Sequence, residues 1–364
     1  MSEQVAVIRP AVRPTTAMRV RQINELVAQV FPAVIITMLV VLIFIIAARS
    51  GVTTAASQLE NGLAIGGIYA LIAVGYTMVY GIIELINFAH GDVFTLSAFY
   101  SVLVVRYAGD FGFNINSLAT DHGLLGFIAA LAILLPITML LAGLTGVTIE
   151  RVAYRRLRNA PKLAPLITAV GVSFFLEGMM QARAGSANVN TGMRDWVHGD
   201  AFSIGGFTVT WKNLFVIGSA IIAMIFLQAF VRRTRLGKAM RATAQERDAS
   251  LLSGININRT IAATFFIGSA MAAVGGIVYS IKEGVIVWNL GFQFGIIAFT
   301  SAVLGGIGNI VGAGLGGFMI GLFAVFGSQL IGAQWANSIV FIMLIIVLTF
   351  RPVGLLGLRI PDRA

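Results

Sequence analysis

Long stretches without a charged side chain dominate the pattern of hydrophobic and polar positions in this chain. Uncharged runs occur at 31–48, 61–83, 123–149, 213–231, 260–281 and 313–350. An α-helix rises about 1.5 Å per residue, so each run is long enough to cross a hydrocarbon core about 30 Å thick. The pattern predicts an all-α, polytopic helical membrane protein with about ten transmembrane helices, some of them broken or rich in glycine.

The ten predicted spans are 31–49, 62–83, 92–108, 123–148, 163–181, 212–230, 260–281, 293–305, 313–331 and 336–350. The segments at 92–108 and 293–305 are the weakest of these, because they are short or interrupted by glycine. Between the fifth and sixth spans, residues 182–211 are polar and rich in small residues, which predicts an ordered loop outside the membrane.

Composition agrees with this interpretation. The chain is 58% hydrophobic and 11% charged, with a mean hydropathy of +0.91. A soluble domain carries roughly a quarter charged residues. Segments of alternating polarity, typical of outer-membrane barrels, are absent from the sequence. Contact with membrane lipid is therefore expected along most of the chain.

The net charge of +10 reflects orientation in the membrane. Of the 25 basic residues, 19 fall before the first span, within 150–162, within 231–260 or after the last span. Ten spans place these four segments on one side, which is the positive-inside pattern. We therefore expect a multi-pass membrane protein with both termini in the cytoplasm, and no binding of nucleic acid.

One charged segment lies between two hydrophobic spans. Residues 231–260, VRRTRLGKAMRATAQERDASLLSGININRT, contain seven basic residues together with Glu246 and Asp248. Met240, Ala244 and Leu251 are spaced as on one helix face. The segment predicts a water-exposed helix that binds a soluble partner. Because no other part of the chain could supply energy, we expect this partner to be a motor protein. A solvated surface helix without a partner is the alternative.

A second motif spans residues 62–92. Gly62, Gly66, Ala70 and Ala73 place small residues along one helix face, which predicts close contact between helices. The motif ends in Glu84, Asn87, His90, Gly91 and Asp92, where the chain re-enters the membrane. Ionisable residues at membrane depth often line a pathway. Alternatively, Asn87, His90 and Asp92 cap and connect two helix ends at the cytoplasmic interface.

The glycine-rich segment 300–321 contains GAGLGG, which formally matches a dinucleotide-binding pattern. That reading requires a strand before it and an acidic residue about twenty positions later, and neither is present. The segment instead predicts a broken helix at Gly305, Gly306, Ile307, Gly308 and Asn309, followed by close packing through Gly308, Gly312 and Gly316. Discontinuous helices often mark transport pathways.

Glu177 is a single acidic residue inside the fifth span. It either faces a pathway or pairs with a basic side chain such as Arg183.

No motif for catalysis or cofactor binding is present in the sequence. There is no phosphate-binding loop, no metal-ligand spacing, no cysteine and no nucleophile with a matched base. We therefore expect no catalytic residues, no metal site, no cofactor bound by this chain and no enzymatic activity of its own.

Three blocks carry a resemblance to a known family: GIYALIAVGYTMVYGIIELINFAHGD, MRATAQERDASLLSGININRTIA and FTSAVLGGIGNIVGAGLGG. In this order they resemble the permease subunits of bacterial ABC importers for branched-chain amino acids, of the H type. The resemblance implies four partner subunits: a periplasmic binding protein, a second homologous permease subunit, and two cytoplasmic ATPase subunits that bind the ATP. It also implies ATPase coupling through the segment matched by 237–258, and thus through Arg241, Glu246, Arg247, Asp248, Leu251, Leu252 and Gly254.

The resemblance divides the chain into three parts. Residues 1–57 add a basic cytoplasmic tail and one further transmembrane helix, 58–357 form the permease domain with its coupling loop at 231–260, and 358–364 form a cytoplasmic tail. The added helix is either peripheral or packed on the partner permease. Two alternatives remain open for function: a permease of this family for urea or short amides, and an ion-coupled secondary transporter.

Overall fold

The computed structural model describes residues 16–158, 160, 161, 163–185 and 187–357. Most of the predicted basic tail, with Arg9 and Arg13, lies outside the described residues. The predicted C-terminal tail, with Arg359 and Arg363, lies outside them as well.

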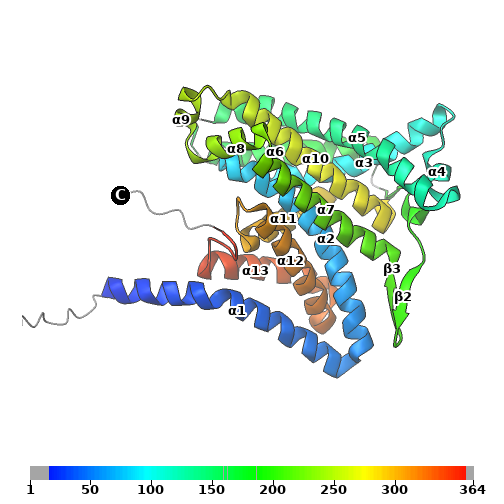
Figure 1. Ribbon diagram of the computed structural model, residues 1–364, viewed down its shortest axis with the longest axis horizontal. Coiled ribbons are helices and arrows are strands. Elements are labelled where there is room, and N and C mark those ends of the chain that lie inside the picture. The colour runs from blue at the N-terminus through cyan, green and yellow to red at the C-terminus, as the bar shows by residue number, and fades with distance from the viewer. Residues whose placement is uncertain (1–15, 159, 162, 186, 358–364) are drawn as a thin grey trace, which may run out of the picture.

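All ten predicted spans are helical in the described chain (Figure 1). They are α1 (Thr16–Ser50), α2 (Val52–Ile83), α3 (Ala89–Asp110), α5 (Gly123–Ile149), α6 (Leu163–Ala184), α7 (Trp211–Arg233), α10 (Ile257–Glu283), α11 (Leu290–Gly305), α12 (Ile310–Ile331) and α13 (Ala336–Phe350). Three shorter helices connect them: α4 (Ile115–Asp121), α8 (Arg235–Gln245) and α9 (Arg247–Leu252).

Eight helices of the described chain are long and apolar enough to cross a membrane. The other two of the ten are α3 and α11, which coincide with the weakest predicted spans. Helix α11 has 16 residues and is about 24 Å long, shorter than a typical hydrocarbon core. Helix α3 carries Asp92, Arg106 and Asp110. The fold is therefore that of a polytopic helical membrane protein. Two of its helices differ from ordinary transmembrane spans: α11 is short, and α3 carries charged residues.

Irregular elements lie at the helix ends. A π-helix, η1 (Glu150–Tyr154), and a 3₁₀ turn, η2 (Arg155–Leu157), continue α5. A second 3₁₀ turn, η3 (Arg194–Trp196), lies between β1 and β2, and η4 (Ala333–Trp335) leads directly into α13. Strand β1 (Val189–Asn190) pairs antiparallel with β4 (Val285–Ile286), with Val189 opposite Ile286. Strand β2 (Asp200–Ile204) forms a hairpin with β3 (Phe207–Thr210). The described part of the predicted 182–211 loop is therefore ordered.

Helices α2, α10 and α12 form the centre of the molecule, and most of their side chains are buried. The outer helices expose large apolar side chains, as in Leu125 of α5, Phe175 of α6 and Ile222 of α7. Since lipid tails are as apolar as these side chains, this surface suits a hydrocarbon environment.

Small residues bring α2 and α12 together, as the 62–92 motif predicts. A β-carbon added to Gly66 would lie 2.7 Å from the Cα of Phe318, and one added to Gly62 would lie 3.3 Å from the Cα of Leu322. At Gly66 a larger residue would force the two backbones apart, and at Gly62 it would require Leu322 to shift. The expected close helix contact is confirmed.

One face of helix α1 packs against other helices of this chain. Phe31 and Ile35 are buried in a cluster with side chains of α11, α12 and α13, and Ile46 packs with Leu322 and Phe326. The opposite face of α1 exposes Phe44 and other apolar residues.

The basic segments gather at one end of the helix bundle. Figure 1 shows α8, α9 and the start of α1 towards one end, with α4 and the β2–β3 hairpin at the other. Arg158, after α5, donates a hydrogen bond to Asn258 near the start of α10 over 2.6 Å. The predicted grouping of 150–162 and 231–260 on one side is therefore present in the fold.

Candidate coupling surface and polar site in the membrane interior

The connection between α2 and α3 is an irregular loop tied to the end of α5. Glu84 ends α2 in the left-handed conformation (φ 55°) and is exposed. Asn87 is buried, and its Oδ1 accepts a hydrogen bond of 3.1 Å from the Tyr154 hydroxyl of η1. Asn87 thus connects two helix ends, as the second sequence interpretation expects.

His90 and Asp92 lie deeper, in the first turn of α3, and both are fully buried. No side chain caps this helix, whose N-cap residue is Phe88, so the expectation that Asn87, His90 and Asp92 cap it is wrong. His90 does not cap the helix because its buried ring packs against Tyr76, with ring centroids 5.8 Å apart. Nε2 of His90 and the hydroxyl of Tyr76 have no hydrogen-bond partner among the described residues.

Asp92 meets two other helices. Its Oδ2 accepts a short hydrogen bond from the Ser173 hydroxyl of α6, while Oδ1 has no partner in the described chain and lies against Gly291 of α11. One turn beyond Ser173, Glu177 is also buried, and the backbone amide of Phe292 lies within its reach. We call Asp92, Ser173 and Glu177 the interior polar site.

Glu177 therefore belongs to a buried cluster. In the described residues its carboxylate forms no ion pair with Arg183, so that alternative is wrong. No group of three or more His, Cys, Asp or Glu side chains in the described chain could hold a metal ion.

The predicted helix break at Gly305–Asn309 is confirmed. Gly306 and Gly308 adopt positive φ values of 108° and 87°, and Asn309 caps α12 by accepting a hydrogen bond of 3.1 Å from Gly312 N–H. The C-terminal segment covers the break, since Leu355 and Leu356 donate backbone hydrogen bonds to Leu304 and Gly305. Irregular backbone at this depth needs such protein cover. Packing accounts for the break, and its role in a pathway stays a prediction.

Close packing follows the break, as predicted. A β-carbon on Gly316 would lie 3.1 Å from the Cα of Gly305, and one on Gly312 would lie 3.1 Å from its carbonyl carbon.

The charged segment 231–260 forms two short helices. The side chain of Thr234 caps α8 by accepting a hydrogen bond of 3.0 Å from Gly237 N–H, and the chain leaves the helical conformation at Glu246 (φ −155°, ψ 112°) before α9. Met240 and Ala244 pack on the core, as their spacing predicts. Leu251 is exposed, so its expected place on the same face is wrong. The extended residue Glu246 rotates α9 relative to α8.

The predicted coupling residues divide into two groups. Arg247 and Arg241 bond to the rest of the chain: Arg247 donates a hydrogen bond of 3.0 Å to the Ile83 carbonyl at the end of α2, and Arg241 one of 3.3 Å to the Arg232 carbonyl. The others lie at the surface of α9 and its two ends: Glu246, Asp248, Leu251, Leu252 and Gly254. Leu252 is 91% exposed and follows the exposed Leu251 directly, so the two leucines form a small apolar patch. The structure therefore presents an apolar and charged surface that is bonded directly to α2.

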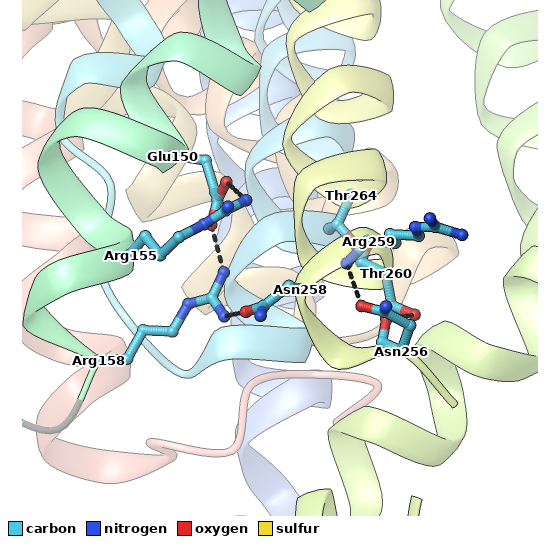
Figure 2. Close-up of polar contacts among 8 residues, drawn as sticks. All are labelled: Glu150, Arg155, Arg158, Asn256, Asn258, Arg259, Thr260 and Thr264. Atoms are coloured by element: carbon cyan, nitrogen blue, oxygen red, sulfur yellow. Dashed lines mark hydrogen bonds and ion pairs between the residues drawn. The ribbon is translucent and has the colours of Figure 1, made fainter. Parts of the chain in front are cut away.

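An ionic network beside this surface was not predicted from the sequence. Glu150 is fully buried in η1; its Oε2 lies 2.7 Å from Nη2 of Arg155, and it forms a short ion pair with Arg158. Figure 2 shows Arg158 joining Glu150 to Asn258 across α5 and α10. Burial lowers the pKa of Arg158, and the charge of Glu150 opposes that shift. In the sequence, the residue that could indicate this network is Glu150, because it is an acidic residue at the end of a long uncharged run and precedes several arginines.

Comparison with known proteins places the chain in a family. The family described as "Branched-chain amino acid transport system / permease component" matches residues 58–349. The permease protein BraD of a high-affinity branched-chain amino acid transport system from Pseudomonas aeruginosa is 41% identical over 303 residues, covering 82% of this chain and 95% of that protein.

More distant relatives are also permeases of branched-chain amino acid transport systems. The permease protein LivH of the corresponding Escherichia coli K12 system is 39% identical, with 82% of this chain and 94% of that protein covered. A probable LivH from Methanocaldococcus jannaschii is 24% identical over 82% of this chain and 91% of that protein. No solved structure matches the chain. The match over residues 58–349 and the identity to these relatives show that the chain belongs to the permease family of branched-chain amino acid transport systems.

Proposed function

We propose that this chain is the membrane-spanning permease of an ATP-driven ABC importer that moves branched-chain amino acids across a bacterial inner membrane. In this proposal a periplasmic binding protein delivers the amino acid, and the chain pairs with a second homologous permease. Two cytoplasmic ATPase subunits bind and hydrolyse ATP, and both termini of the chain lie in the cytoplasm.

One observation carries the proposal: identity of 39–41% to permeases of branched-chain amino acid systems over 94–95% of their length. That coverage includes the helices around the interior polar site as well as α8 and α9. It favours the branched-chain system over urea or short-amide transport.

Coupling runs through α8 and α9 in this proposal. Their surface faces the ATPases, and the Arg247 bond to the Ile83 carbonyl transmits their displacement to the end of α2. The loop after α2 leads within a few residues to Asp92. Movement of α9 also acts on α10, because only Ser253–Asn256 separate the two helices. Rigid helices joined by hydrogen bonds are able to carry such coupling over long distances.

The interior polar site is the candidate polar part of the pathway. Asp92 and Glu177 come from α3 and α6 and meet the start of the short helix α11. Carboxylates inside a membrane are costly and usually functional. Their chemistry suits the ammonium group of an amino acid, which is the same in leucine, isoleucine and valine.

The test is uptake by purified protein in liposomes. The chain is reconstituted with the partner permease, the two ATPases and the binding protein, and uptake of radiolabelled leucine is measured with and without internal ATP. We expect uptake that requires ATP and every subunit. Leucine uptake by this chain alone, driven by a proton or sodium gradient, would support a secondary transporter instead. Preference for urea over leucine would support the amide alternative.

A further inference from the structure

We infer that the cavity between α9, the start of α10 and the end of α5 receives an acidic segment of the soluble ATPase partner. This inference rests on the proposed function and adds to it: the permease surface is a receptor as well as a protruding helix. We call this cavity the arginine cavity. Its lining residues are Arg155, Arg158, Arg247, Asp248, Leu251, Gly254, Ile255, Asn256, Ile257, Asn258 and Ile261.

The arginine cavity is large and has a mixed lining. Its volume is about 670 Å³, many times the roughly 30 Å³ that one water molecule occupies in the liquid. It therefore has room for several side chains of a partner segment. Ile255, Ile257 and Ile261 supply apolar wall, and three arginines supply hydrogen-bond donors. An apolar wall with a few convergent polar groups is typical of a binding site.

Positive charge in the arginine cavity exceeds negative charge. Three guanidinium groups face two carboxylates, and one of these, Glu150, is fully buried behind the cavity and already bonded to Arg155 and Arg158. Arg247 makes a single hydrogen bond in the described chain, to the Ile83 carbonyl, which leaves its other N–H groups without a protein acceptor there. Burial lowers the pKa of Arg158, Glu150 opposes that shift, and the nearby charges of Arg155 and Arg247 add a smaller lowering through their repulsion. A carboxylate that entered the cavity would relieve this repulsion and accept charge-assisted hydrogen bonds.

The position of the cavity favours a protein over a lipid headgroup. Leu251 lines the cavity, and the next residue, Leu252, is the most exposed large apolar side chain of α8 and α9. A soluble protein surface is able to cover both leucines while it places an acid next to Arg247. A lipid headgroup would satisfy the arginines and leave Leu252 in water.

The chain offers a matched control. Arg259 is exposed and lies one residue from Asn258, yet it does not line the cavity. Figure 2 shows its side chain pointing away from Arg158 and Glu150, to the other side of α10. Arg247→Glu and Arg259→Glu therefore make the same charge change inside and outside the arginine cavity.

The experiment measures binding of the purified ATPase subunits to the permease pair in nanodiscs of neutral phosphatidylcholine. We expect Arg247→Glu to weaken binding at least about tenfold and Arg259→Glu less than about twofold, because loss of a partner from a desolvated charge pair costs more than loss of a rim charge. The salt dependence of binding should also fall in Arg247→Glu. Equal effects of the two variants would overturn the inference.

A second step separates lost attraction from local damage, since Arg247→Glu also breaks the bond to α2. The chain contains no cysteine, so a single Ile255→Cys variant carries a photo-crosslinker to the cavity without removal of native thiols. We expect it to attach to an acidic segment of the ATPase. Arginine at that acidic position should restore binding to Arg247→Glu, which structural damage would not allow.

The remaining outcomes are also decisive. A crosslinked segment without an acidic residue would overturn the inference while the proposed function stands. A binding defect of Arg247→Glu that appears only in nanodiscs containing phosphatidylglycerol would assign the cavity to an anionic lipid headgroup and overturn the inference. Failure of the unmodified permease to bind the ATPases would contradict the proposed function itself.

Discussion

Gly91 allows α3 and α11 to meet at the interior polar site. A β-carbon at this position would lie 2.6 Å from the Cα of Gly295, closer than real contacts permit. We expect Gly91→Ala to separate the helices and lower the free energy of unfolding by about 1–3 kcal/mol, the usual cost of overpacking. Gly178→Ala on α6 is the control, because a β-carbon there meets nothing within 4 Å. Thermal unfolding in detergent measures both; an unchanged melting temperature in Gly91→Ala would contradict the close contact.

Asp92 provides a second prediction for a single residue. Asp92→Asn keeps the size of the side chain and an oxygen that accepts from Ser173, but removes the negative charge. We expect ATP-driven leucine uptake to fall about tenfold or more, equivalent to roughly 1.4 kcal/mol in barrier height, with membrane insertion unchanged. Ser173→Ala keeps the charge and should reduce uptake less. If Ser173→Ala is as damaging as Asp92→Asn, the hydrogen bond matters and the charge does not.

Sequence patterns located the elements well and their geometry less well. Uncharged runs found the ten helices, and Gly305–Asn309 correctly marked a break, because hydropathy and backbone freedom are local properties. The sequence does not indicate the break at Glu246, since glutamate is a good helix former. The link from Glu150 through Arg158 to Asn258 joins residues about a hundred positions apart, which one sequence alone does not reveal. For the same reason the arginine cavity emerged only with the fold.

Helix α9 is the element on which the coupling proposal is most directly tested. Leu252 is almost fully exposed and makes no contribution to the core, so Leu252→Ala should leave the melting temperature unchanged. If the ATPase covers this side chain, its truncation should weaken ATPase binding about tenfold, because burial of a leucine contributes roughly 1.5–3 kcal/mol. Val52→Ala at the start of α2 is the control, exposed at the opposite end of the bundle (Figure 1). Equal ATPase affinity in Leu252→Ala and the unmodified chain would remove α9 from the docking surface.

The molecule as a whole has two chemically different ends. One end carries the arginines after α5 and those of α8 and α9, and the other carries α4 and the β2–β3 hairpin. The positive-inside rule predicts that the arginine-rich end lies in the cytoplasm, the side on which the proposed ATPase subunits would bind. Helix α1 packs along the bundle without covering the arginine cavity, whose lining residues all lie between 155 and 261. Helix α1 is therefore compatible with the proposed docking of the ATPases.

Labelling of single cysteines tests this orientation. Arg259→Cys lies beside the coupling surface and Ser203→Cys lies on the β2–β3 hairpin, and both positions are exposed. With a membrane-impermeant maleimide, we expect Ser203→Cys to react in intact spheroplasts and Arg259→Cys to react only in inside-out vesicles. The unmodified chain supplies the blank, because it has no thiol to label. Reaction of Arg259→Cys from outside intact spheroplasts would place the arginine-rich end on the side opposite to ATP. That result would contradict both the coupling proposal and the inference about the arginine cavity.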